Sequence, residues 1–341
     1  MDTIRNKSDE IEVRNKIIVI SFFCSLLVIW IHTYNLDTYG ITEASTGLSR
    51  FVYYLEDTWN NFTGIAVPFF FFISGWLFFR TFELKIIREK YKSRIKSILI
   101  PYLVWCTFYY FVFAILTSLP LTSRFMNASK SHLSVLGWLE SLWPNEYYTL
   151  WFLKEIIIYI SLCPLIYTLL KNRYIGGAIL FLLFANEITG CYHVPFLGYL
   201  YYLAGAYLAI NFKHIEYKRS GACTIASCFF FIILALFRFK PINHVIIRLV
   251  FFVATWFFLD FLPLKKPMPW WMKISFFTYV AHDLFLEAFE KIVLIVFGKN
   301  AVFALLDYIL APIVVFLVLA VIAACLKKYT PKIWSIVTGM R

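Results

Sequence analysis

The segment from Ala66 to Arg80 reads AVPFFFFISGWLFFR, and it decides the solvent in which this chain folds. A helix built from it has apolar side chains on every face, whereas a surface helix of a soluble protein keeps one polar face. Together with the preceding residues from Phe62, the apolar run approaches the about 20 residues that cross the hydrocarbon core of a bilayer. The segment therefore predicts a transmembrane helix that ends at Arg80.

The rest of the chain has the same character. Of its 341 residues, 61% are hydrophobic and only 15% are charged, whereas soluble domains are about half apolar. The net charge of +12 does not indicate nucleic-acid binding, because the basic residues lie in short gaps between apolar runs. The seven cysteines form no pattern typical of a zinc site or a disulfide framework. We therefore expect a helical membrane protein that uses no metal.

Ten windows approach membrane-spanning length, which predicts an all-α, polytopic membrane protein with about ten transmembrane helices. The predicted spans are Ile17–Tyr34, Phe62–Phe79, Ser97–Thr117, Thr149–Leu170, Tyr174–Ile188, Val194–Ile210, Gly221–Phe237, His244–Leu262, Ile274–Phe297 and Val302–Leu326. No linker rich in Pro, Gly or Ser interrupts them, so we expect a single membrane domain over residues 1–341. The first span lacks a small-residue cleavage site and is interpreted as a retained helix, not a signal peptide.

Lysine and arginine predict the orientation, because positively charged short loops stay in the cytoplasm. With the N-terminus inside, the inner segments hold 23 of these residues, the outer segments hold 6, and 3 lie within helices. Both termini are therefore expected to be cytoplasmic. The strongest basic cluster, residues 80–96, is explained by topology and anionic lipid. It would equally suit a cytoplasmic donor with phosphate groups, because arginine forks onto phosphate oxygens.

Ionisable groups inside predicted spans are costly and are therefore candidate functional residues. They are His32, Glu155, Glu187, Arg248, His282, Asp283 and Glu287. His32 lies about 15 residues, or roughly 22 Å, from the inner end of its helix, which predicts a place near the outer end of the membrane core. The alternative for this lone histidine is a buried structural role. Ser74 and Gly75 permit close approach of a ligand or of another helix, and taken alone they favour helix packing.

The order of the motifs resembles the membrane acyltransferase 3 family over nearly the whole chain, and in particular its enterobacterial common antigen O-acetyltransferase group. The residues that carry the resemblance are Val28 to His32 (VIWIH), Phe71 to Trp76 (FFISGW) with Arg80, Lys92 to Lys96 (KSRIK) with Ile100 to Tyr102 (IPY), Leu150 to Leu153 (LWFL), and Ser275 to His282 (SFFTYVAH). Two positions depart from the pattern, since Ser21 and Ser97 stand where many relatives have arginine. These departures bear on the donor-binding residues and not on His32.

The resemblance implies an integral membrane O-acyltransferase. It would transfer an acyl group, expected to be acetyl, from cytoplasmic acyl-CoA to a hydroxyl of a glycan or glycolipid at a bacterial cytoplasmic membrane. The expected donor-binding residues are Arg80, Lys92, Arg94 and Lys96 for the phosphates, and Ser74 and Gly75 for the pantetheine arm. His32 would act as general base, since histidine titrates near neutral pH. An acyl-histidine intermediate is the open alternative.

The roles of three further residues stay open between alternatives. Trp151 either stacks on a sugar of the acceptor or anchors in the aromatic belt. Glu155, one turn deeper, either orients His32 or binds the acceptor, unless it pairs with Arg248 or near Lys154. His282 lies about eight residues above the inner end of its helix, which suits the donor arm or helix packing better than the base role.

Two other functional classes fit the composition. A transporter or flippase of a lipid-linked saccharide would also be polytopic with buried charges, but the sequence contains no paired broken helices or inverted repeat. A protein that is only a structural partner of a polysaccharide-synthesising machine, with no catalytic activity, would tolerate the loss of His32. Membrane lipid and the acceptor are the expected partners, and nucleic acid is not.

Overall fold

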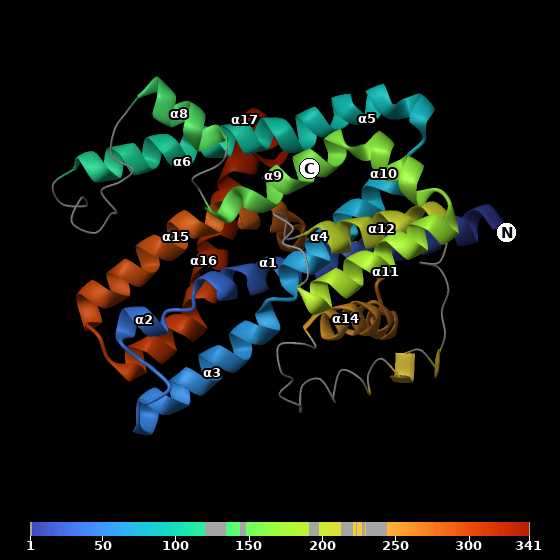
Figure 1. The fold of residues 1–341 in the computed structure, drawn as a ribbon. Coiled ribbons are helices and arrows are strands. Elements are labelled where there is room, and N and C mark those ends of the chain that lie inside the picture. Colours follow the sequence, from blue (N-terminus) through green and yellow to red (C-terminus); the bar gives the residue numbers. More distant parts are fainter. Residues whose placement is uncertain are drawn as a thin grey trace. The chain divides into compact units, whose positions relative to one another are not determined.

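Helices account for every predicted span that lies in the described part of the chain (Figure 1). The computed structural model describes residues 2–119, 134–143, 148–190, 198–212, 221–222, 224–226, 229 and 244–340, and these contain helices but no strand. The predicted span Gly221–Phe237 lies mostly outside the described residues. The all-α prediction is confirmed.

Several helices have the length and composition of membrane spans. Asp9–Tyr39, Leu84–Ser118 and Ala301–Tyr329 are each long and apolar enough to cross a bilayer. The pair α9 (Trp151–Ser161) and α10 (Cys163–Leu170) passes the same test as one broken span. Many large apolar side chains of these helices are exposed, as expected where lipid is the solvent. The multi-pass membrane class is supported, while ten spans and the orientation stay predictions.

The described chain divides into two compact units. The first comprises Met1–Phe82 and Pro164–Val318, and the second comprises Glu83–Cys163 and Leu319–Arg341. The first unit contains α1 (Asp2–His32), α2 (Leu36–Tyr39), α3 (Gly47–Thr63), α4 (Ala66–Phe79), α11 (Arg173–Thr189), α12 (Tyr199–Asn211), α14 (His244–Phe258), α15 (Ser275–Phe297) and most of α10 and α16 (Ala301–Tyr329). The second contains α5 (Ile87–Arg94), a π-helix over Ile95–Leu99, α6 (Ile100–Ser118), α8 (Val135–Leu142), α9 and α17 (Pro331–Thr338).

In the first unit, α4 and α12 lie side by side (Figure 1) and touch through two glycines. A Cβ atom on Gly75 would meet the backbone oxygen of Tyr202 at 2.1 Å, and one on Gly205 would meet that of Phe72 at the same distance. No side chain fits at either position. Close backbone packing of this kind drives helix association inside lipid, where the hydrophobic effect between helices is absent.

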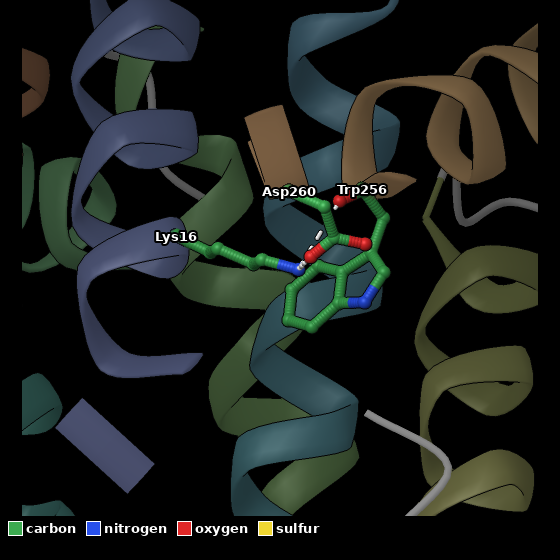
Figure 2. A network of polar contacts seen from close by, with 3 residues as sticks. All are labelled: Lys16, Trp256 and Asp260. Carbon is green, nitrogen blue, oxygen red and sulfur yellow. Dashed lines mark hydrogen bonds and ion pairs between the residues drawn. The ribbon is translucent and has the colours of Figure 1, made fainter. Parts of the chain in front are cut away.

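A buried ion pair fixes α1 to α14 and to the 3₁₀ turn Leu259–Phe261 (Figure 2). The Lys16 ammonium pairs with the Asp260 carboxylate and lies 4.7 Å from the centre of the Trp256 ring. The side-chain amide of the neighbouring Asn15 donates to the Leu264 carbonyl oxygen at 2.6 Å. Removing one partner of a buried ion pair typically costs about 3–5 kcal/mol. These contacts therefore fix how far α1 is shifted along its axis relative to α14, and with it the position of His32 at the end of α1.

The second unit is organised around α6. Its Trp105 indole N–H donates to the Val337 carbonyl oxygen of α17 at 3.0 Å. Gly339 ends α17 with a φ of 69°, a conformation that favours glycine. A Cβ there would lie 2.3 Å from the Ser97 backbone oxygen of the π-helix. The C-terminal segment therefore packs against the π-helix, into which the basic motif Lys92 to Lys96 continues.

Candidate functional site

His32 is the last residue of α1, and its ring lies beside that of His282 from α15. The two ring centres are 5.2 Å apart and the ring planes are inclined by 41°. The pair rests on a packed interface between α1 and α15 in the first unit. The hydroxyl of buried Thr33 donates to the Ile29 carbonyl oxygen at 2.8 Å and fixes the backbone after His32. Asp283 interacts electrostatically with His32.

His282 presents a buried acceptor atom. Its side chain is 0% exposed, and its Nδ1 lies 2.7 Å from the Tyr279 carbonyl oxygen. A carbonyl oxygen only accepts, so Nδ1 carries the hydrogen, and Nε2 of the neutral ring is then an acceptor. This Nε2 has no hydrogen-bond partner among the described residues. The site therefore contains a histidine nitrogen able to accept a proton or a hydrogen bond.

The prediction that His32 and His282 lie at different depths is wrong. Counting from the inner end of each apolar run treats α1 and α15 as starting at one level. The ring of Trp271, just before α15, instead packs against that of Phe22, well inside α1, with ring centres 5.1 Å apart. His32 and His282 follow these two rings by a similar number of residues, and their rings are neighbours. The donor-arm role of His282 stays a prediction.

Ser74 and Gly75 lie on α4, where the predicted pantetheine arm would pass. The Tyr202 backbone fills the space at the Gly75 Cα, so the structure gives Gly75 a packing role. Ser74, the preceding residue, is half-buried. Contact of either residue with a donor stays a prediction.

Arg80 ends α4 and already has a partner. Its guanidinium makes two parallel hydrogen bonds to the Glu10 carboxylate, at 2.8 and 2.6 Å. It also lies 5.0 Å from the centre of the Trp76 ring. Such a bidentate pair has the geometry with which arginine binds phosphate.

The other three predicted phosphate-binding residues belong to the second unit. Lys92 and Arg94 lie in the last turn of α5, and Lys96 lies in the π-helix that follows. Lys92 and Lys96 are exposed, and Arg94 is half-buried. These side chains are accessible to an anion, and their role in binding a donor stays a prediction.

Trp151 and Glu155 lie on α9, which also belongs to the second unit. Trp151 is half-buried and opens the helix. Glu155 is buried and accepts a hydrogen bond from the Tyr159 hydroxyl at 2.7 Å. The predicted roles of Glu155 toward His32 and of both residues toward an acceptor stay predictions.

Sequence reasoning missed a group of buried polar residues directly beyond His32. We call it the Asn35 cluster, and its members are Asn35, Tyr39, Glu56, Asp307 and Tyr308. Asp307 lies inside the predicted span Val302–Leu326, so the rule that selected His32 could have found it. Glu56 lies outside every predicted span and gave no such signal. Burial raises the pKa of Glu56 to about 8, while a hydrogen bond from the Asn35 backbone opposes the rise.

Comparison with protein families identifies the chain. The family model described as an acyltransferase domain, Acyl_transf_3, matches residues 15–327. This range includes His32, His282 and residues of both compact units. No curated protein and no solved structure matched the chain in two further comparisons. In the described residues, no group of three or more His, Cys, Asp or Glu side chains could hold a metal ion. The chain belongs to the acyltransferase 3 family and is a multi-pass membrane acyltransferase.

Proposed function

We propose that this enzyme is an O-acetyltransferase that moves an acetyl group from cytoplasmic acetyl-CoA to a hydroxyl of a glycan or glycolipid. The observation that carries the proposal is the pair of histidines from α1 and α15, with ring centres 5.2 Å apart. Transfer to a hydroxyl requires a group that takes up its proton, and histidine does this near neutral pH. The enterobacterial common antigen O-acetyltransferase group is the proposed place within the family, and the bacterial cytoplasmic membrane is the proposed location.

The proposed mechanism gives each residue of the pair one task. His32 accepts the proton of the acceptor hydroxyl while the hydroxyl oxygen attacks the carbonyl carbon of the thioester. A carbon–oxygen bond forms, the carbon–sulfur bond breaks, and the proton passes from His32 to the leaving sulfur. His282 Nε2, a buried acceptor without a partner among the described residues, would accept a hydrogen bond from His32 once the substrates are bound and leave the second His32 nitrogen for the hydroxyl. Asp283 stabilises the positive charge that His32 acquires, because the two interact electrostatically.

The donor is proposed to bind from the cytoplasm. Lys92, Arg94 and Lys96 would pair with its phosphates, and their accessibility on α5 and the π-helix supports this. One membrane domain over residues 1–341 would complete the transfer, with Glu155 and Trp151 contributing to the acceptor side. The family match across both units supports a single functional domain.

Cells that produce the enzyme should contain acetyl esters that matched cells without the gene lack. Because the proposed acceptor carries hydroxyl groups, mass spectrometry of surface glycans and lipids should show a gain of acetyl groups that alkali removes. Labelled acetyl-CoA added to membranes should deliver its label to the same fraction. The proposal fails if no hydroxyl-bearing glycan or lipid gains an acetyl group when the enzyme is present.

Arg94→Ala is expected to raise the apparent KM for acetyl-CoA about tenfold or more, because a charge-assisted hydrogen bond is worth roughly 1.5–3 kcal/mol. Arg94→Lys keeps the charge but loses the two-pronged geometry, so it should restore binding only in part. The measurement is acetyl transfer in membranes as a function of acetyl-CoA concentration.

Arg173→Ala is the matched control, because it removes an exposed arginine from a predicted inner segment outside the basic cluster. It should leave the KM for acetyl-CoA unchanged. Equal KM values for wild type, Arg94→Ala and Arg94→Lys would assign Arg94 to topology or lipid contact.

A further inference from the structure

Two buried carboxylates of the Asn35 cluster meet at Asn35. Its backbone N–H donates to Glu56 Oε2 at 3.4 Å, and its side-chain amide donates to Asp307 Oδ2 at 2.9 Å. The Tyr39 hydroxyl donates to the same Asp307 oxygen at 3.3 Å. These bonds bring together α3, α16 and the segment between α1 and α2. One oxygen of each carboxylate is held by the protein.

The remaining oxygens of the cluster are not paired. Glu56 Oε1, Asp307 Oδ1 and Asn35 Oδ1 are buried and have no hydrogen-bond partner within the described ranges. The three residues are 0%, 1% and 5% exposed, respectively. Buried polar atoms in native proteins are nearly always hydrogen-bonded, because leaving one unpaired is costly. Three unpaired acceptors around one residue therefore indicate a ligand that donates hydrogen bonds.

We infer that the Asn35 cluster binds hydroxyl groups of the acceptor. This inference rests on the proposed function and assigns its acceptor-binding side to residues outside the family motifs. Carboxylate and amide oxygens accept hydrogen bonds from hydroxyls, and the bonds to ionised carboxylates are the stronger ones. A glycan carries several neighbouring hydroxyls on one ring, which matches several acceptors in one place.

A hydroxyl fits this cluster better than a metal cation does. A hydroxyl can donate to an ionised carboxylate and accept from a protonated one, so it satisfies Glu56 in both states. A cation is bound only by the ionised form. Burial holds the pKa of Glu56 at about 8, which keeps the protonated form populated at neutral pH.

The position of the cluster agrees with a role beside the reacting group. Asn35 follows His32 by three residues, at the end of α1 that the charge distribution predicts to be outside. Trp30 donates from its indole N–H to the Tyr308 carbonyl oxygen at 3.1 Å. Its ring packs edge-on against Trp59, which is 38% exposed. An exposed aromatic ring and buried acceptors suit the apolar and polar faces of a sugar.

The test compares Glu56→Gln and Asp307→Asn with wild type in membrane vesicles that receive labelled acetyl-CoA. Each variant should incorporate label into glycan or lipid hydroxyls about tenfold more slowly or worse, since an amide N–H cannot accept the hydrogen bond that a carboxyl oxygen accepts. Binding of acetyl-CoA to the purified protein in detergent should stay within about twofold, because the donor side is intact. The melting temperature should not fall, since each change keeps the shape of the side chain and leaves no buried charge in its place.

Asp37→Asn is the matched control, because Asp37 is an exposed carboxylate two residues from Asn35. It should transfer acetyl groups like wild type. Tyr39→Phe removes a single oxygen from the cluster and should slow transfer by a smaller factor, about two- to fivefold, even if a carboxylate variant fails to fold.

The results that overturn the inference are distinct. Wild-type rates in Glu56→Gln, Asp307→Asn and Tyr39→Phe would mean that the cluster only supports the fold. If the variants lose acetyl-CoA binding in parallel with transfer, the Asn35 cluster has only a structural role. If the wild-type rate depends on added calcium or sodium chloride, the cluster is a cation site. If wild type labels no hydroxyl at all, the proposed function fails and the inference with it.

Discussion

His32→Ala is expected to insert, fold and bind acetyl-CoA, while its rate of acyl transfer falls by a factor of about 10² to 10⁴. This is the range over which a positioned general base accelerates proton transfer. A histidine that served only packing would show its loss first in thermal stability. Transfer, acetyl-CoA binding and thermal unfolding in detergent should therefore be measured on the same preparation.

His32→Gln provides the control for packing, because glutamine fills similar space and hydrogen-bonds but does not titrate. It should be as inactive as His32→Ala and at least as stable. Near-normal transfer in either variant would refute the base role. A reaction with labelled acetyl-CoA, stopped without acceptor, then separates the two mechanisms: label bound covalently to the protein supports an acyl-histidine, and unlabelled protein supports direct attack by the hydroxyl.

Gly205→Ala is expected to destabilise the first unit by at least about 1–3 kcal/mol, the usual cost of forcing extra atoms into a packed interior. The added methyl group would lie 2.1 Å from the Phe72 backbone oxygen, and a backbone atom cannot turn aside as a side chain can. Thermal unfolding in detergent should show a clearly lower midpoint. A midpoint equal to that of wild type would mean that α4 and α12 separate without penalty.

Two further alanine variants serve as comparisons for the unfolding midpoint of Gly205→Ala. Gly221→Ala should not lower the midpoint, because no heavy atom in the described ranges lies within 4 Å of a Cβ at that position. The methyl group of Gly75→Ala would meet the Tyr202 backbone oxygen at the same distance at which that of Gly205→Ala meets the Phe72 backbone oxygen. If Gly75 serves only packing, the two variants should lose similar amounts of stability. If folded Gly75→Ala also binds acetyl-CoA more weakly, whereas folded Gly205→Ala does not, Gly75 contacts the donor as well.

Much of the fold was accessible from the sequence, because apolar runs of spanning length have few soluble explanations. The helical class and the multi-pass character followed from those runs and agree with the structure and the family match. The close packing of α4 against α12, which involves Gly75 and Gly205, was only partly predictable. The first glycine lies in a conspicuous motif, but nothing local pairs it with a residue far along the chain.

The site was predictable as a set of residues and not as an arrangement. Motif order selected His32 and His282, yet counting residues from the inner ends separated them, because α15 begins beside Phe22 of α1 and not beside the inner end of that helix. The Asn35 cluster was missed for a related reason. Its two carboxylates come from distant parts of the chain, and Glu56 lies on a helix that no hydropathy window selects. Burial of such groups is decided by tertiary packing.

The paired hydrogen bonds between Arg80 and Glu10 have a consequence for any anion that reaches this arginine. A phosphate does not simply add to Arg80, since it must displace a carboxylate that already occupies both prongs of the guanidinium. Binding there is an exchange, and its net free energy is the difference between two charge pairs. Each exchange also breaks the Arg80–Glu10 pair, so an anion at the end of α4 removes one contact between α4 and the N-terminal part of α1.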